Sequence, residues 1–278
     1  MNNTFSFKRF KNLLLNDGKM YYRNFGLMLL LLCCLPAIFM VMHLLFHGNT
    51  GWEFRYIFIN FIAIIAMMAV PAKVYGKVNL SREGVGFAML PASSLEKFLS
   101  MFFYCAIVTP ILALLGGYLI DTMLSILPFS GMNERIPIFS DDFSDIFDTN
   151  VFDTGGVMPF SYSQMKPYFY ISTIFSNLCF SAIFMLGNMV FKKHKTGRTL
   201  ICFIGVTFVL SIGAFAVFIK SEWFQGLLGN GNAFDEEQIT AAFYDFINAG
   251  MVWSLVALIV ITIVLYFFTY RKIKTQKY

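Results

Sequence analysis

The residues of this chain that could do chemistry are few, and their spacing brings few of them together. His43 and His47 are four residues apart, so on a helix they share one face, as zinc ligands can. The third histidine, His194, is far away in the sequence, and no H-E-x-x-H motif is present. We therefore predict a polar pair at the end of an apolar segment and no metal site.

The cysteines, acids and nucleophiles form no better constellation. Cys33 and Cys34 are adjacent, but no second pair supports a soft-metal site, and all five cysteines lie in apolar stretches. An acidic cluster lacks the D-x-D-x-D-G spacing of a calcium loop, which favours a solvated acidic face. Its members are Asp141, Asp142, Asp145, Asp148 and Asp153. No Ser–His–Asp set converges and no G-x-x-x-x-G-K-[ST] loop exists, so we predict no enzyme, no ATP hydrolysis by this chain alone and no cofactor.

Apolar sequence dominates the rest of the chain and indicates a membrane protein. Of the 278 residues, 58% are hydrophobic and 13% are charged, about half the charge of a soluble domain. Six uncharged runs approach or reach the roughly 20 residues that cross a membrane. They are 26–46, 56–72, 98–120, 168–191, 199–219 and 250–270. We predict one all-α transmembrane domain over residues 1–278, with Arg55 and Lys73 snorkelling at the ends of the short second span.

The distribution of Lys and Arg predicts the orientation of these spans. Residues 1–25, 73–97, 192–198 and 271–278 hold 17 of the 21 basic residues, whereas 13 of the 16 acidic residues lie in the other connections. Because cytoplasmic loops carry the excess of Lys and Arg, both termini and the loops between spans 2 and 3 and between spans 4 and 5 are expected in the cytoplasm. The net charge of +5 therefore indicates topology and no nucleic-acid partner.

The N-terminal stretch predicts a helix on the membrane surface. Residues 5–16 read FSFKRFKNLLLN, in which Phe7, Phe10 and Leu14 recur at helical spacing while basic and polar residues fill the other face. This pattern is typical of an amphipathic helix lying in the headgroup plane before the first span. The alternative is a basic tail that only sets topology.

The loop between spans 2 and 3 contains a short element of its own. Ser93 and Glu96 form an S-x-x-E capping box, so the third span is predicted to begin there, and Pro91 ends whatever precedes it. The stretch 81–90 has room for a short helix or turn. We predict a docking surface for a partner, and the alternative is an ordinary interfacial loop. The candidate residues are Ser81, Arg82, Glu83, Val85, Phe87 and Met89.

Polar residues inside the spans are uncharged. No Asp, Glu, Lys, Arg or His lies near the middle of any predicted span, which disfavours ion-driven transport. Span 4 carries a polar stripe of Thr173, Asn177 and Ser181 at four-residue spacing. Such groups either hydrogen-bond between packed helices or line a path, and packing is the more common case.

The loops on the outer side are acidic and one of them is long. In 121–167, apolar residues recur at helical spacing from Phe139 to Phe147, which predicts a short amphipathic helix on the outer face of the membrane. In 221–249, Asp235 can cap a helix that runs into span 6, and a partly re-entrant segment is also compatible with the sequence.

Taken in order, these parts resemble the membrane subunit of a type-2 ABC transporter. The local sequence SREGVGFAMLPASSLEKFLS is similar to the stretch of such permeases in which an LP-S turn and a charged helix start follow the docking element. The resemblance covers the whole chain in layout and about 20 residues in motif. It implies that 5–16 is the connecting helix and that 81–90 is the coupling helix, with Arg82 and Glu83 as its exposed charges.

The resemblance also implies a function and partners. The chain would be the permease subunit of an ATP-driven transporter, with export the expected direction, in the plasma or inner membrane. Its partners would be a cytoplasmic ABC-type ATPase and a second permease chain, and its substrate is not identified by the sequence. A hypothesis from another class is a membrane scaffold or sensor whose acidic outer loop binds a partner. Replacing Arg82 and Glu83 separates the two, because only the permease would lose an ATPase.

Overall fold

The computed structural model describes residues 5–46, 52–80, 84–127, 162–220 and 236–275, and every regular element in these ranges is a helix. Six of the described helical segments are long and apolar enough to cross a membrane, which is the architecture of a multi-pass membrane protein. They are Phe7–Met42, Phe54–Val74, Ser94–Ser125, Ile171–Val190, Lys195–Val217 and Gly250–Thr275. The predicted all-α class with six candidate spans is thereby confirmed for the described residues.

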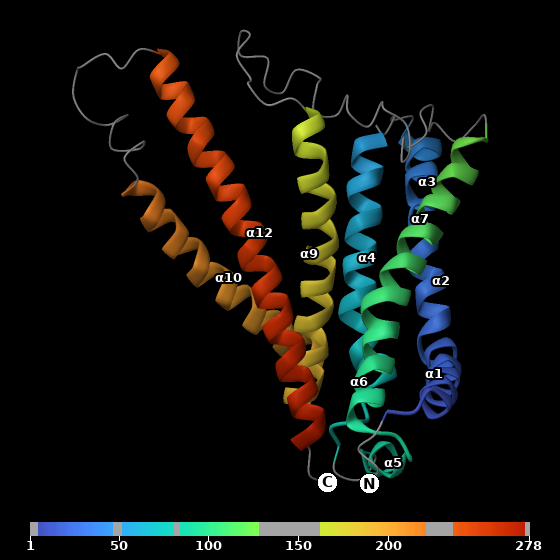
Figure 1. The fold of residues 1–278 in the computed structure, drawn as a ribbon. Coiled ribbons are helices and arrows are strands. Elements are labelled where there is room, and N and C mark those ends of the chain that lie inside the picture. The colour runs from blue at the N-terminus through green and yellow to red at the C-terminus, as the bar shows by residue number, and fades with distance from the viewer. Residues whose placement is uncertain (1–4, 47–51, 81–83, 128–161, 221–235, 276–278) are drawn as a thin grey trace.

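The segments run between two ends of one bundle, and the first and last described residues lie at the same end (Figure 1). We call this end the basic end and the opposite one the far end. The exposed basic side chains on the segments that meet at the basic end are Lys8, Lys11, Lys19, Arg23, Lys73, Lys77, Lys192, Lys193, Arg198, Arg271, Lys272 and Lys274.

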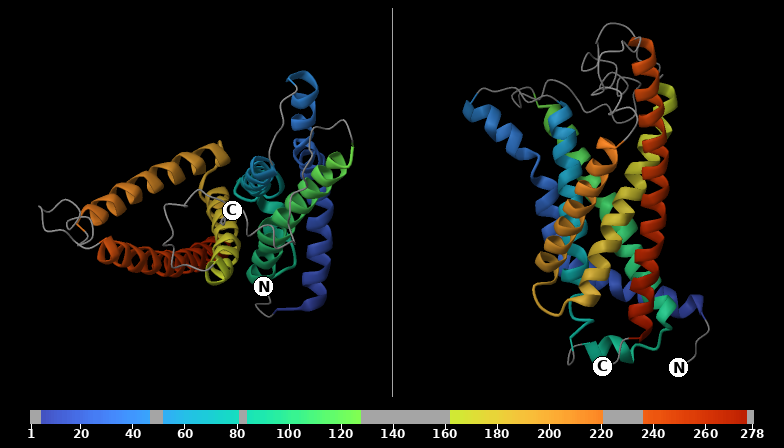
Figure 2. Two further views of the ribbon diagram at one scale, coloured as in Figure 1. Left: turned by 90° about the horizontal axis from the view of Figure 1, so that it is seen from above. Right: turned by 90° about the vertical axis from the view of Figure 1, so that its left-hand side faces the viewer.

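The chain enters the bundle through a helix that lies across it. α1 (Phe7–Tyr21) runs crosswise to the spans at the basic end, and the π-helical η1 (Tyr22–Gly26) turns the chain into α2 (Leu27–Cys34) (Figure 2). The helix predicted over 5–16 is therefore present and extends to Tyr21. Its orientation is the one expected of a helix on a membrane surface.

The side of α1 that faces the protein includes only part of the predicted apolar stripe, since Leu14 packs against the core. The buried residues of α1 are Leu13, Asp17 and Tyr21, which are four residues apart. Phe7 is exposed and Phe10 is half-buried. The predicted stripe thus runs from the exposed Phe7, through the half-buried Phe10, to Leu14 at the protein.

The predicted continuous span 26–46 is two helices in the structure. α2 ends at Cys34, and α3 (Ala37–Phe46) begins after Pro36. Proline has no N–H to donate and its ring clashes with the preceding turn, so the ladder of helical hydrogen bonds is interrupted. Shorter turns bridge the break, such as the bond of 2.9 Å from the Ile38 N–H to the Leu35 carbonyl. The predicted span is present as part of the candidate span Phe7–Met42, and it is interrupted at Pro36.

The second and third spans are α4 (Trp52–Val74) and a column of three helical segments. α6 (Ser94–Phe102) continues into the π-helical η2 (Phe103–Val108) and then into α7 (Thr109–Ser125). The wider π turn lies directly before Pro110, which cannot donate to a carbonyl of the preceding turn. The Thr109 hydroxyl donates to the Tyr104 carbonyl at 2.7 Å and supplies a hydrogen bond inside this turn.

The last three spans are α9 (Tyr162–Val190), α10 (Lys195–Ile219) and α12 (Glu236–Thr275). α9 and α12 pack against each other, whereas α10 diverges from the bundle toward the far end (Figure 1). Residues 236–249 are a continuous part of α12, and the rest of the segment for which a partly re-entrant course was considered lies outside the described residues. Asp235, the acidic cluster at 141–153 and the helix predicted from Phe139 to Phe147 lie outside the described residues.

The core lies where α2, α4, α6 and α9 meet, and small residues bring these helices close. Phe25, Val70, Met101 and Met189 are among its fully buried members. On the neighbouring α7, a Cβ added at Gly117 would lie 2.8 Å from a methyl carbon of Ile59 on α4. Glycine therefore permits an approach of α7 to α4 that a larger residue would prevent, as is common between membrane helices.

The far ends of α4 and α7 are joined by a buried ion pair that the sequence reasoning missed. Arg55 is 0% exposed, and its guanidinium lies 3.3 Å from a carboxylate oxygen of Asp121, which is 1% exposed. We expected Arg55 to snorkel to the interface and Asp121 to begin the outer loop. Instead α7 extends to Ser125 and places Asp121 on the helix face toward Arg55, so both expectations were wrong.

Candidate functional site

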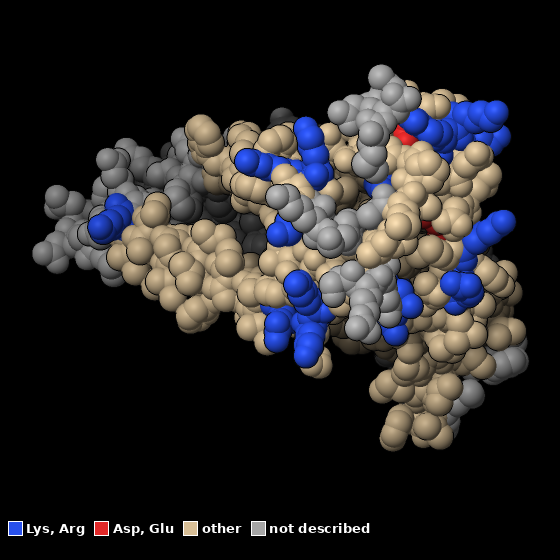
Figure 3. Space-filling view, turned by 90° about the horizontal axis from the view of Figure 1, so that it is seen from below, with Lys and Arg blue, Asp and Glu red and all other residues tan. Residues whose placement is uncertain are grey.

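The candidate site is the basic end, where the sequence predicts a docking element. Figure 3 shows Lys and Arg gathered over this face with little acidic surface between them. α5 (Gly84–Met89) is a short helix between α4 and α6 that lies across the ends of the spans (Figures 1 and 2). Of the two forms that the sequence left open, helix or turn, the structure has the helix.

α5 has one side held by the bundle and one side open. Met89 is 78% exposed, whereas Phe87 is half-buried and packs against the core. The Lys97 ammonium at the start of α6 donates to the Phe87 carbonyl at 2.7 Å and lies 5.0 Å from the centre of its ring. Of the predicted docking residues, Val85 is half-buried, and Ser81, Arg82 and Glu83 lie outside the described residues. Thus α5 is attached directly to α6 and leaves Met89 free for contact.

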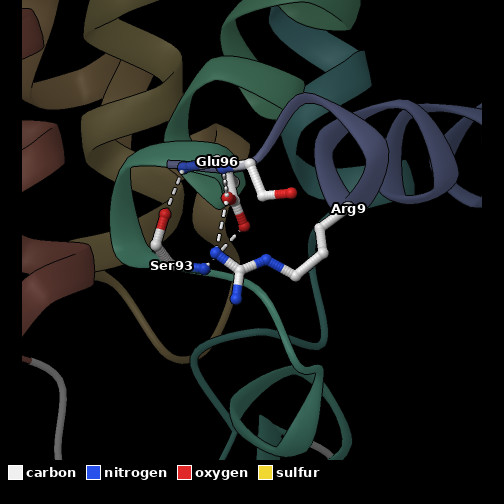
Figure 4. Close-up of polar contacts among 4 residues, drawn as sticks. Arg9, Ser93 and Glu96 are labelled. Carbon is white, nitrogen blue, oxygen red and sulfur yellow. Dashed lines mark hydrogen bonds and ion pairs between the residues drawn. The ribbon is translucent and has the colours of Figure 1, made fainter. Parts of the chain in front are cut away.

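The predicted capping box at the start of α6 is present and does more than cap the helix (Figure 4). The Glu96 N–H donates to the Ser93 hydroxyl at 3.3 Å, and the Ser93 N–H donates to one Glu96 carboxylate oxygen at 2.8 Å. The other carboxylate oxygen accepts the Ser6 N–H at 2.7 Å and the Arg9 guanidinium at 3.2 Å. Ser6 is the N-cap residue of α1.

One fully buried carboxylate therefore serves the N-termini of two helices. Glu96 is 0% exposed, and its negative charge lies at the positive ends of both the α1 and the α6 dipoles. Hydrogen bonds to a charged acceptor are stronger than neutral ones, which offsets the cost of burying the carboxylate. The crosswise helix α1 is locked to the helix that carries α5.

A second buried carboxylate joins α1 to two further elements. Asp17 is 3% exposed and accepts hydrogen bonds from the Ser100 hydroxyl at 2.6 Å and the Tyr75 hydroxyl at 3.1 Å. Burial raises the pKa of the Tyr75 hydroxyl well above its ordinary value, and the charge of Asp17 raises it further. Tyr75 therefore stays protonated and donates. Asp17 connects α1 with α6 and with the segment that leaves α4.

The segment that leaves α4 is also held by the second half of the bundle. The Asn188 amide on α9 donates to the Tyr75 carbonyl at 3.1 Å, and the Lys195 ammonium on α10 donates to the Gly76 carbonyl. The Asn79 amide donates to the Phe191 carbonyl at 3.4 Å. A displacement of residues 75–80 would therefore strain hydrogen bonds that involve α1, α6, α9 and α10.

These polar groups hold helices together. In the described ranges, no three His, Cys, Asp or Glu side chains come close enough to share a metal ion. The sequence reasoning found the Glu96 box because its signal is local. It missed Asp17 and Tyr75. For Asp17 the available signal was the four-residue spacing of Leu13, Asp17 and Tyr21 around one side of α1.

The structure separates the three residues of the predicted polar stripe on α9. Thr173 and Asn177 line a pocket of about 480 Å³ between α4, α9 and α12. Ser181 is 0% exposed, and its hydroxyl lies 3.8 Å from the sulfur of Met185 on the same helix. The two outer residues of the stripe therefore line a cavity, and the third is buried among helices. Whether the stripe lines a path stays a prediction.

No protein-family model, curated protein or solved structure matches this chain.

Proposed function

We propose that this chain is the permease subunit of an ATP-driven transporter of the ABC type, and that α5 is the coupling element on which a separate ATPase docks. The observation that carries the proposal is α5 itself: a short helix lying across the basic end, attached to the start of a span and bearing the exposed Met89. The sequence resemblance described above points to the same function. ATP hydrolysis would take place in the partner subunit.

The contacts of α5 supply a route by which a docked ATPase would act on the spans. Movement of α5 pulls on α6 through the bond of 2.7 Å between Lys97 and the Phe87 carbonyl. α6 takes α1 with it through Glu96 and Asp17, which are both buried. Because these joints are hydrogen-bonded or paired with charge, the three elements respond as a unit, and ATP-driven closure of the partner would tilt the spans.

The proposal includes an orientation and an assembly. The basic end faces the cytoplasm, as the excess of Lys and Arg there favours, and both termini are then cytoplasmic. The membrane is the plasma or inner membrane, and the direction is export. Two permease chains, identical or different, enclose the path between them. Such a mechanism needs no ionisable side chain in mid-membrane, in agreement with the six uncharged runs of the sequence.

Co-purification with a single exposed-residue variant tests the proposal. The tagged chain is purified from its native membrane after mild cross-linking, and P-loop ATPases are quantified by mass spectrometry. Met89→Glu should reduce the recovered ATPase at least tenfold, because it places a charge on the docking surface without touching the bundle. The matched control is Met123→Glu, since Met123 is 66% exposed at the opposite end of the bundle.

The outcomes separate the permease from the scaffold hypothesis. A stoichiometric P-loop ATPase that is lost in Met89→Glu and kept in Met123→Glu supports the permease. If no P-loop ATPase is recovered even with cross-linking, the permease proposal is wrong, and a scaffold or sensor becomes the better hypothesis.

A further inference from the structure

The pocket between α4, α9 and α12 has the size and position of a ligand site in the far half of the bundle. Its volume of about 480 Å³ lies within the range of about 300–1,000 Å³ that small-molecule sites have. Asn60 on its wall follows Arg55 by five residues on α4, which is about 8 Å of helix rise from the ion pair at the far end. None of the contacts at the basic end belongs to this pocket.

Two cross-helix hydrogen bonds hold α12 against α9 beside the pocket. The hydroxyls of Tyr168 and Ser254 lie 2.9 Å apart, and the Ser254 hydroxyl also donates to the Met251 carbonyl at 2.8 Å. A serine has one hydroxyl proton, so Tyr168 is the donor to Ser254. Deeper in the bundle, the Tyr266 hydroxyl donates to the Leu178 carbonyl at 2.9 Å. These bonds tie the α9 wall of the cavity to its α12 wall.

The polar atoms on the wall include both donors and acceptors with no partner inside the described chain. The Asn60 amide nitrogen donates to the Tyr56 carbonyl at 2.9 Å and lies 3.4 Å from the Tyr118 hydroxyl, which leaves the Asn60 carbonyl oxygen without a donor among the described residues. The Asn177 amide and the Ser176 hydroxyl make no hydrogen bond within the described residues. Such groups are costly in a membrane unless something hydrogen-bonds to them.

The uncharged, partly apolar lining restricts the class of molecule that the pocket can bind. Within the described part of the chain, no Lys, Arg, His, Asp or Glu lines the pocket, so an ionised group would find no counter-ion on its wall. Ile64, Leu255 and Leu258 supply an apolar wall for a hydrocarbon portion. An ester or ether only accepts hydrogen bonds and would leave the Asn60 carbonyl unsatisfied, whereas a hydroxyl both donates and accepts.

We infer that this pocket binds a neutral amphiphile whose head group carries several hydroxyls, such as a glycosyl head group, with its apolar chain against Ile64, Leu255 and Leu258. That the bound amphiphile is the transported cargo rests on the proposed function. The binding itself does not, because the pocket lies within one chain and away from α5.

Photolabelling of the chain by itself tests the inference. The protein is extracted directly into polymer-bounded nanodiscs, so that no detergent competes, and is labelled with an alkyl glucoside that carries a diazirine in its alkyl chain. Labelling should be saturable and should map to peptides of α9 and α12 that contain Asn177 and Leu258. Unlabelled octyl glucoside should compete, whereas octanoate, octyltrimethylammonium and octyl methyl ether should not.

Three variants make the result specific to the wall residues. Asn177→Leu keeps the size of the side chain and should weaken labelling about tenfold, and Asn177→Asp should give octyltrimethylammonium the ability to compete. The control is Thr207→Val on α10, whose hydroxyl bonds to the backbone of its own helix outside the pocket. Equal labelling of Asn177→Leu and the unmodified chain, unsaturable labelling, or competition by octanoate would each overturn the inference.

The assay also keeps the two proposals apart. Saturable labelling of a chain that recovers no ATPase would leave the pocket assignment standing and remove the transporter. Unspecific labelling of a chain that does recover an ATPase would remove the pocket assignment and leave the transporter proposal standing.

Discussion

Replacing Glu96 with alanine should loosen the junction of α1 and α6. The carboxylate accepts three N–H groups from outside its own residue, from Ser6, Ser93 and Arg9. Leaving a buried backbone N–H without an acceptor costs about 1–3 kcal/mol. The Arg9 side chain is 31% exposed, so its share of the loss is small, about 0.5 kcal/mol. We therefore expect a loss of about 3 kcal/mol in the local opening free energy.

Amide hydrogen exchange of the chain in nanodiscs measures this loss directly. Local opening governs exchange, so about 3 kcal/mol corresponds to a rise of about a hundredfold in the exchange rate of the first turns of α1 and α6. Ser93→Ala removes one acceptor and should raise the rate only about fivefold, in line with a cap worth about 1 kcal/mol. Lys8→Ala is the control, because Lys8 is exposed and has a position next to Arg9.

The prediction is tested most strictly by whether the exchange rates rise in both α1 and α6. If the Glu96→Ala rates rise less than threefold, or rise in α6 while α1 stays protected, then Glu96 is an ordinary cap and does not join the two helices. In that case the route from α5 to α1 in the proposed mechanism would be wrong.

Three further outcomes are expected from the buried polar contacts. The pKa of Tyr75 is raised in the folded state above its ordinary value of 10.0. Its hydroxyl therefore contributes stability that is complete below pH 10 and is lost as the pH rises further. Tyr75→Phe should flatten the decline in thermal stability above pH 10. Gly18→Ala should destabilise the protein in a thermal melt, because the added Cβ would lie 2.5 Å from the Tyr104 hydroxyl oxygen. In a Tyr104→Phe background this clash is absent, and the same change should stabilise the protein, because alanine is favoured over glycine in a helix by about 1 kcal/mol. Arg55→Met or Asp121→Leu alone should each cost about 3–5 kcal/mol in denaturant unfolding, and the double variant should cost much less, since it removes both buried charges together; equal costs for the single and double variants would contradict the pairing.

The features that the sequence predicted correctly have short-range causes. A span needs only an apolar run of sufficient length, and the six candidate spans follow from that. The capping box at Ser93 and Glu96 involves residues three apart, and the crosswise helix α1 follows from its own amphipathic pattern. Length, capping and periodicity are properties of neighbouring residues, so they could be predicted without knowledge of the fold.

The sequence reasoning was wrong where one local feature, an uncharged apolar run, was taken to define a helix and its ends. The apolar run 26–46 suggested one helix, but Pro36 splits it into α2 and α3. Because spans were defined as runs without charged residues, Arg55 and Asp121 were placed outside the helices. A charged residue can lie on a buried helix face if a partner of opposite charge is close. The ion pair satisfies this condition because α4 and α7 pack side by side.

Tertiary structure alone decided which polar groups meet. Asp17 and Ser100 are 83 positions apart, Arg9 and Glu96 are 87 apart, and the pocket joins Asn60 with Asn177 and Ser254 from three helices. Which face of a membrane helix turns inward depends on the shapes of its neighbours, because lipid and protein are equally apolar and hydrophobicity does not choose between them. The sequence by itself determined a six-span chain with a capped third span, and only helix packing determined which of its polar residues became joints and which became the wall of a pocket.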